Sequence, residues 1–138
     1  CERKDLRIDY TGIDVSVEMI KKARERFPTA RFEVADIRTT ESAPDEFDVV
    51  VASGIFSFPG TRPELFIEGV ARRMYAAAKQ YAAFNLLSCV TNKPESDEYH
   101  ADPSRFAKMA SVITSQFVLR HDYHPRDFSV ILHQESQS

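Results

Sequence analysis

Three positions in this chain carry groups suited to binding a polar ligand, and each lies where a predicted strand ends: Asp14, Asp36 and the pair Ser53-Gly54. In open α/β sheets, ligands bind in the crevice beyond the carboxyl ends of the strands. The spacing of these residues therefore predicts a ligand site along one edge of such a sheet.

The two aspartates suit different parts of a nucleoside. The carboxylate of Asp14 can accept two hydrogen bonds from a vicinal diol, as in ribose, although with Ser16 it can equally cap the helix that follows. The carboxylate of Asp36 can accept from an exocyclic amine while the Ile37 N–H serves a ring nitrogen. The alternative for Asp36, an aspartate that starts a surface turn, is the commoner arrangement. Ser53-Gly54 permits close backbone approach to a ligand because glycine lacks Cβ, and a plain turn would look the same.

The elements that position these residues follow from hydrophobic spacing and capping signals. Strands are expected at residues 7–14, 31–36, 47–52, 81–89, 117–123 and 128–133, and the run Val49-Val50-Val51-Ala52 predicts a strand buried on both faces. Helices are expected from the N-cap Ser16 to Pro28, from Pro63 to about residue 79, and from Asp102-Pro103 to Ile113. The alternation predicts an α/β fold: a Rossmann-like, doubly wound, mostly parallel sheet with an antiparallel C-terminal strand, in one domain over residues 1–138.

The composition excludes several other classes of protein. With 18 basic and 21 acidic residues the net charge is −3, which argues against binding nucleic acid mainly through phosphate contacts. Apolar runs fall far short of the ~20 residues that span a bilayer, and no stretch resembles a signal peptide, so we expect a cytoplasmic protein without membrane attachment. The two cysteines, Cys1 and Cys89, form no disulfide framework, and Cys89 is expected to be a reduced, buried thiol.

The chain resembles the class I S-adenosylmethionine-dependent methyltransferases in three stretches, Gly12-Ile13-Asp14-Val15-Ser16, Val34-Ala35-Asp36-Ile37 and Phe47-Asp48-Val49-Val50-Val51-Ala52-Ser53-Gly54. The resemblance implies methyl transfer from S-adenosylmethionine to an acceptor, which we expect to be a small molecule. It also implies the cofactor-binding residues, which are Asp14 beside Val15 at the ribose, Asp36 with Ile37 at the adenine, and Ser53 and Gly54 under the methionine part.

One motif of that family is missing. The glycine-rich first motif should lie upstream of Arg7, and none of the 4 glycines forms a G-x-G pattern. The resemblance thus implies that the first strand and helix are missing, and with them the strand at the centre of the sheet. We expect a truncated version of a longer enzyme, with the gap closed by a second copy in a homo-oligomer or by strand exchange, by rearranged strands, or by an N-terminal segment.

The acceptor site is expected near Phe56, Tyr99 and His100, with Ser57 and Phe58 beside Phe56. The alternatives are core packing for Phe56 and a solvated loop for the other two. No catalytic base is assigned, because a sulfonium is a good leaving group and positioning of the acceptor can suffice. No metal is expected, since neighbours in His121-Asp122-Tyr123-His124 point to opposite faces of a strand.

Two other functions stay open. A nicotinamide-dependent oxidoreductase would place its ribose-binding acid at Asp14, but it explains Asp36 and the antiparallel last strand less well. A non-catalytic interaction domain would have lost its cofactor site together with the glycine-rich motif.

Overall fold

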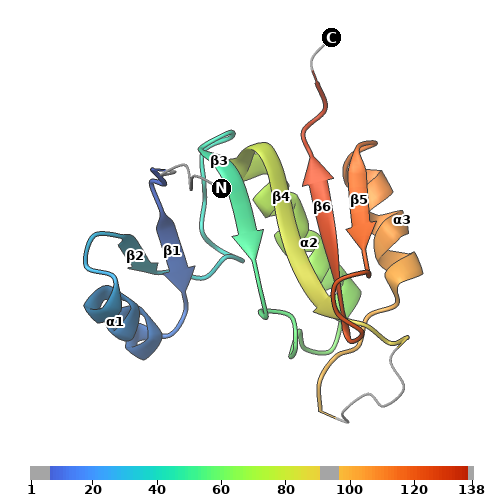
Figure 1. The fold of residues 1–138 in the computed structure, drawn as a ribbon, viewed down its shortest axis with the longest axis horizontal. Coiled ribbons are helices and arrows are strands. Elements are labelled where there is room, and N and C mark those ends of the chain that lie inside the picture. The colour runs from blue at the N-terminus through green and yellow to red at the C-terminus, as the bar shows by residue number, and fades with distance from the viewer. Residues whose placement is uncertain (1–6, 91–96, 137–138) are drawn as a thin grey trace, which may run out of the picture. The chain divides into compact units, whose positions relative to one another are not determined.

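The computed structural model describes residues 7–90 and 97–136. The chain divides into two compact units, the first ending at Glu41 and the second beginning at Ser42 (Figure 1). The predicted α/β architecture is confirmed, because parallel strand pairs occur in both units and an antiparallel strand occurs in the second. A single domain over residues 1–138 stays a prediction.

The first unit is a strand–helix–strand arrangement of β1 (Thr11–Asp14), α1 (Val17–Arg26) and β2 (Arg31–Val34). β1 and β2 pair in parallel, with Asp14 opposite Val34. As expected, α1 is capped by Ser16, whose hydroxyl accepts a hydrogen bond from the Met19 N–H at 3.2 Å. Ile20 is the buried residue of α1, on the apolar face of this helix.

Gly12 allows two aromatic rings to close over β1. The rings of Tyr10 and Phe32 meet edge to face, with centroids 5.8 Å apart. A Cβ on Gly12 would lie 2.8 Å from Cδ1 of Phe32 and 3.1 Å from Cε1 of Tyr10. Any larger residue at position 12 must therefore displace the ring pair.

The second unit is a four-stranded sheet with two helices. In chain order its elements are β3 (Phe47–Ala52), α2 (Pro63–Ala77), β4 (Ala78–Leu87), α3 (Pro103–Ile113), β5 (Phe117–Arg120) and β6 (Asp127–His133). The strands lie in the order β3-β4-β6-β5, and β6 is antiparallel to both of its neighbours. The predicted antiparallel C-terminal strand is confirmed, whereas the position of β6 between β4 and β5 was not predicted from the sequence.

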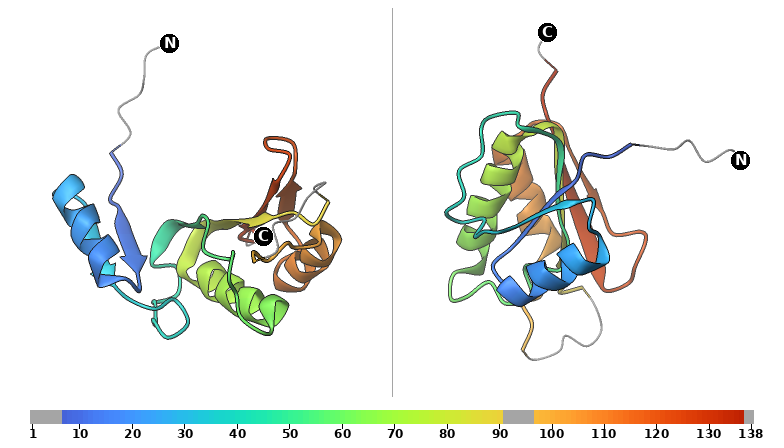
Figure 2. Two further views of the ribbon diagram at one scale, coloured as in Figure 1. Left: turned by 90° about the horizontal axis from the view of Figure 1, so that it is seen from below. Right: turned by 90° about the vertical axis from the view of Figure 1, so that its left-hand side faces the viewer.

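Both helices of this unit lie on the same side of the sheet (Figure 2). β6 turns Phe128, Val130 and Leu132 toward the core, and each is fully buried, because alternate residues of a strand share one face of the sheet. Phe106 of α3 packs against Phe128, with ring centroids 6.1 Å apart. The core of the second unit thus forms between one face of its sheet and α2 and α3.

The second helix passes into the sheet without a loop. α2 ends at Ala77 and β4 begins at Ala78. The side-chain amide of Gln134 donates to the carbonyl oxygen of Tyr75 at 2.6 Å and to that of Ala78 at 2.9 Å. The Tyr75 carbonyl oxygen also accepts from the N–H of the C-cap residue Ala78, so Gln134 adds side-chain hydrogen bonds to both sides of this junction.

The prediction that β3 is buried on both faces is wrong. Val49 is 37% exposed and Val51 65% exposed. Their register with β4 places them on the face opposite the buried Ala82 and Phe84. Within residues 7–90 and 97–136 no strand pairs with the edge of β3 opposite β4. The edge of β1 opposite β2 likewise has no partner strand in this part of the chain. That a second copy, a strand exchange or a further segment fills such an edge stays a prediction.

Some boundaries and one burial prediction also need correction. β2 ends at Val34 rather than at Asp36, because the chain enters a turn there. β5 ends at Arg120 rather than at residue 123, and the expected start of β1 at residue 7 moves to Thr11. Cys89 is exposed rather than buried, because it lies in the turn beyond the end of β4.

We expect Gly12→Ala to lower the free energy of unfolding by about 1–3 kcal/mol, because its methyl group overpacks the ring pair. Gly69→Ala is the matched control, since a Cβ there meets nothing within 4 Å. It should raise the unfolding free energy by about 0.5–1 kcal/mol, as removal of a glycine from a helix interior does. Urea denaturation followed by circular dichroism measures both changes, and equal effects of the two substitutions would contradict the role given to Gly12.

Candidate functional site

Asp14 is the last residue of β1, as predicted, and its carboxylate is exposed. Oδ1 accepts a hydrogen bond from the Ser16 N–H at 2.7 Å, which helps to start α1. Oδ2 accepts no hydrogen bond from the residues that the structure describes. The capping role and the ligand role are therefore compatible, since each uses a different oxygen.

Asp36 follows the neighbouring strand β2, two residues beyond Val34, which is the pairing partner of Asp14. The Ala35 N–H donates to the carbonyl oxygen of Asp14 at 3.0 Å, so the ends of β1 and β2 are directly bonded. The Asp36 carbonyl oxygen then accepts from the N–H groups of Thr39 at 3.0 Å and Thr40 at 2.8 Å. Asp36 thus starts a turn, which was the alternative for this residue, and the turn begins at the same end of the β1–β2 pair as Asp14.

The carboxylate of Asp36 binds Arg38. Oδ1 accepts from the backbone N–H and the Nε–H of Arg38, both at 2.9 Å. Oδ2 accepts from the same Nε–H at 2.9 Å and from Nη2. These hydrogen bonds and the guanidinium charge lower the pKa of Asp36 to about 2, so the carboxylate is ionised at any physiological pH. Arg38 was not among the residues predicted from the sequence, although an aspartate followed two residues later by arginine in a turn is a visible signal.

The neighbours predicted to assist these acids lie beside them. Val15 is exposed and follows Asp14 directly. Ile37 is half-buried and lies in the turn that Asp36 starts.

Ser53 and Gly54 are exposed at the carboxyl end of β3, in the second unit. Gly54 has a φ of +71°, in the left-handed region that favours glycine. Its N–H donates to Oδ1 of Asn85 at 2.9 Å, and Nδ2 of Asn85 lies 3.5 Å from Oδ2 of Asp127. The Asn85 side chain therefore connects the end of β3 with the start of β6. Asn85 was not predicted from the sequence, although it is a single amide within the apolar run of residues 81–87.

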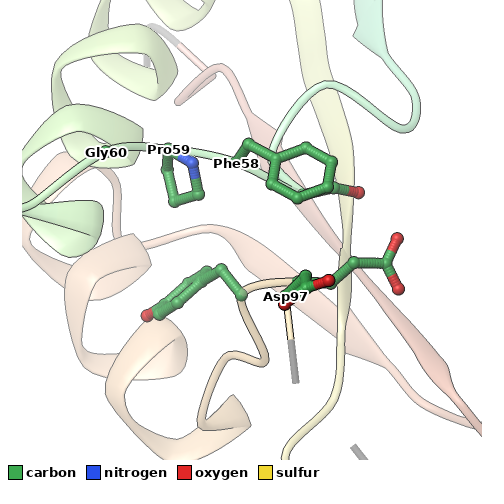
Figure 3. Close-up of a pocket in the computed structure, with 7 residues that line it drawn as sticks. Phe58, Pro59, Gly60 and Asp97 are labelled. Carbon is green, nitrogen blue, oxygen red and sulfur yellow. The ribbon is translucent and has the colours of Figure 1, made fainter. Parts of the chain in front are cut away.

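A hollow of about 440 Å³ lies between two loops of the second unit. Its lining, called the loop hollow below, consists of Ser57, Phe58, Pro59, Gly60, Asp97, Glu98 and Tyr99. The Tyr99 N–H donates to the Ser57 carbonyl oxygen at 2.8 Å and so holds the two loops together. In Figure 3, Phe58 and Pro59 lie on one side of the hollow and Asp97 on the other. Burial and the nearby Glu64 charge raise the pKa of Tyr99, so its phenol stays protonated and can donate a hydrogen bond.

Of the three predicted acceptor contacts, Tyr99 alone is among the residues that line the loop hollow. Phe56 is buried in the core, where its ring meets Phe84 edge to face at a centroid distance of 5.6 Å. Nδ1 of His100 lies 3.3 Å from the Ser88 carbonyl oxygen, so this nitrogen carries the proton. Nε2 of His100 is buried and has no hydrogen-bond partner among the described residues.

The histidines near the C-terminal hairpin make other contacts. Nε2 of His121 lies 2.8 Å from the Ser88 hydroxyl, and Nδ1 of His124 accepts from the Arg126 N–H at 3.1 Å. Over residues 7–90 and 97–136, no group of three or more His, Cys, Asp or Glu side chains is arranged to hold a metal ion. In the same part of the chain, no helix combines the length and the apolar character needed to cross a membrane.

Comparisons with known proteins agree on one family. The model of a methyltransferase domain family matches residues 2–80. A Mycobacterium tuberculosis protein named "Putative methyltransferase Rv1506c" is 32% identical over 142 residues, which cover 98% of this chain and 84% of the relative.

Solved structures share the fold. A SAM-dependent methyltransferase from Methanosarcina mazei has a TM-score of 0.67 at 13% identity, over 90% of this chain and 81% of that one. Magnesium protoporphyrin IX methyltransferase from Synechocystis, solved with bound SAH, has a TM-score of 0.63 at 12% identity, over 91% of this chain and 63% of that one.

We expect Asn85→Ala to release the Gly54 N–H and to lower the unfolding free energy by about 0.5–1.5 kcal/mol, the net contribution of one such hydrogen bond. Amide hydrogen exchange should show faster exchange at Gly54. Gln80→Ala, on an exposed position of the same strand, is the control and should leave this amide unchanged. Unaltered exchange at Gly54 in the Asn85 variant would show that Asn85 does not hold the strand end.

Proposed function

Because this chain belongs to the methyltransferase domain family, we propose that it transfers a methyl group from S-adenosylmethionine to a small-molecule acceptor, using Asp14 and Asp36 to bind adenosine. The family membership favours this reaction over a nicotinamide-dependent oxidation and over a non-catalytic interaction domain. The identity of the acceptor and the roles of individual residues belong to the proposal.

The observation that carries the proposal is the pair of aspartates at bonded strand ends. Asp14 keeps Oδ2 for a ribose hydroxyl while Oδ1 caps α1. Asp36, two residues beyond the position opposite Asp14, would accept the adenine amine, and the Ile37 N–H would donate to a ring nitrogen. Acids on adjoining strands are thus available for the two ends of one adenosine.

The residues present fit this cofactor at the ribose more readily than at the adenine. The Asp14 carboxylate is exposed and has one oxygen without a hydrogen bond from the described residues. Asp36 is ionised and is therefore an acceptor suited to the adenine amine, but Arg38 donates to both of its oxygens. When bound, S-adenosylmethionine supplies an activated methyl group on sulfur, and the protein must position the acceptor in line with it. Ser53 and Gly54 stay predicted contacts of the methionine part.

The loop hollow supports a small acceptor. Its volume of about 440 Å³ falls within the range of about 300–1,000 Å³ that is usual for small-ligand sites. We propose that Tyr99, protonated through its raised pKa, donates a hydrogen bond to the acceptor rather than removing its proton. His100 stays a predicted contact of the acceptor.

We expect Asp14→Asn to weaken binding of S-adenosylhomocysteine by about 1–3 kcal/mol, because a charged acceptor for the ribose hydroxyls is lost. The asparagine keeps Oδ1 for the Ser16 N–H, so α1 should form normally. Isothermal titration calorimetry measures the affinity, and Glu33→Gln, which removes one exposed negative charge from β2, is the matched control. Equal affinities of the two variants and the unaltered protein would remove Asp14 from the site.

A further inference from the structure

Both oxygens of Asp36 accept hydrogen bonds from one neighbouring residue. A carboxylate has about four lone-pair directions for hydrogen bonds. Arg38 directs three hydrogens at them: its backbone N–H at Oδ1, Nη2 at Oδ2, and the Nε–H shared between the two oxygens. An exocyclic amine that approaches Asp36 in this arrangement competes with Arg38 at either oxygen.

The guanidinium also lies on the solvent side of the pair. The side chain of Arg38 is 63% exposed, whereas that of Asp36 is 25% exposed. A ligand arriving from solvent therefore meets the cation before it meets the carboxylate. Both residues belong to the first unit, and the contact spans two positions of one turn that the Thr39 and Thr40 backbone bonds close.

From these contacts we propose that Arg38 competes with the cofactor for Asp36. The guanidinium of Arg38 must leave at least one oxygen of Asp36 before the adenine amine can bind there. This inference rests on the proposed function, because it assigns a specificity residue to the same adenine site. Arg38 then sets the affinity for the cofactor without contributing a favourable contact to it.

The competition is weak enough to be overcome. Ion pairs between exposed side chains contribute little in water, because both partners are well solvated when apart. Arg38 therefore reduces the cofactor affinity without preventing binding. Removal of the arginine should increase affinity by about 1.4- to fivefold, the range that the loss of one exposed ion pair allows.

Whether Arg38 lowers or raises the affinity for a ligand depends on the base that the ligand carries. Arginine carries hydrogen-bond donors and no acceptor, whereas a carboxylate is an acceptor only. The amine of adenine needs Asp36, but a ring carbonyl at the same position, as in the inosine analogue, is repelled by Asp36 and attracted by Arg38. Loss of Arg38 should thus change the two affinities in opposite directions.

The test compares Arg38→Ala with Arg31→Ala. Arg31 is also 63% exposed, lies in the same unit and pairs with an acid, Asp9, at 3.9 Å. Both substitutions remove one positive charge. Calorimetric titrations of each variant with S-adenosylhomocysteine and with S-inosylhomocysteine give the affinities for the two bases.

A proton titration followed by NMR checks the contact itself, without any ligand. In Arg38→Ala the pKa of Asp36 should rise from about 2 toward its ordinary value of 3.8, whereas in Arg31→Ala it should not move. This measurement also shows whether the variants keep their fold.

The proposal is supported if Arg38→Ala alone binds the adenosine ligand more tightly and the inosine ligand more weakly. It is overturned if adenosine affinity is unchanged or reduced in Arg38→Ala while Asp14→Asn still weakens binding, since the adenosine site then exists without the competition. Absence of S-adenosylhomocysteine binding in the unaltered protein and in every variant would instead overturn the proposed function, and this inference with it.

Discussion

The candidate adenosine site depends on one backbone hydrogen bond, from the Ala35 N–H to the Asp14 carbonyl oxygen. It continues the parallel pairing of β1 and β2 by one residue beyond the last matched pair. Because the pairing stops there, the chain turns at Asp36, one residue beyond the last bond between the two strands. A slip of one residue in the register would turn the strand side chains to the opposite face and separate the two acids.

The features that sequence reasoning predicted correctly are local ones. Ser16 and Asp102 cap α1 and α3 through side-chain bonds to N–H groups two or three residues ahead, and such bonds need no distant partner. The buried alternation in β6 is set by the period of a strand. The position of β6 between β4 and β5 depends on pairing among segments far apart in the chain, and no local pattern encodes that order.

In the candidate site, too, the local features were predicted from the sequence and those that depend on contacts between side chains or distant segments were not. The ends of the strands could be found from hydrophobic runs, which identified Asp14 and the neighbourhood of Asp36. The contact of Arg38 with Asp36 depends on a side-chain rotamer, and the loop hollow depends on a bond between Ser57 and Tyr99, which are distant in sequence. The exposure of Val49 and Val51 was missed because a buried strand and a strand with one uncovered face have the same β-branched composition.

The direct passage of α2 into β4 limits how this fold can change in evolution. With no loop residue between Ala77 and Ala78, an insertion of one residue cannot be absorbed there. It would carry Phe84 and Leu86 to the opposite face of the sheet or rotate the helix by about 100° against it. Gln134 would at the same time lose one of the two carbonyl groups that it binds. Length variation among relatives should therefore fall in the connections around β3 and α3 and spare this junction.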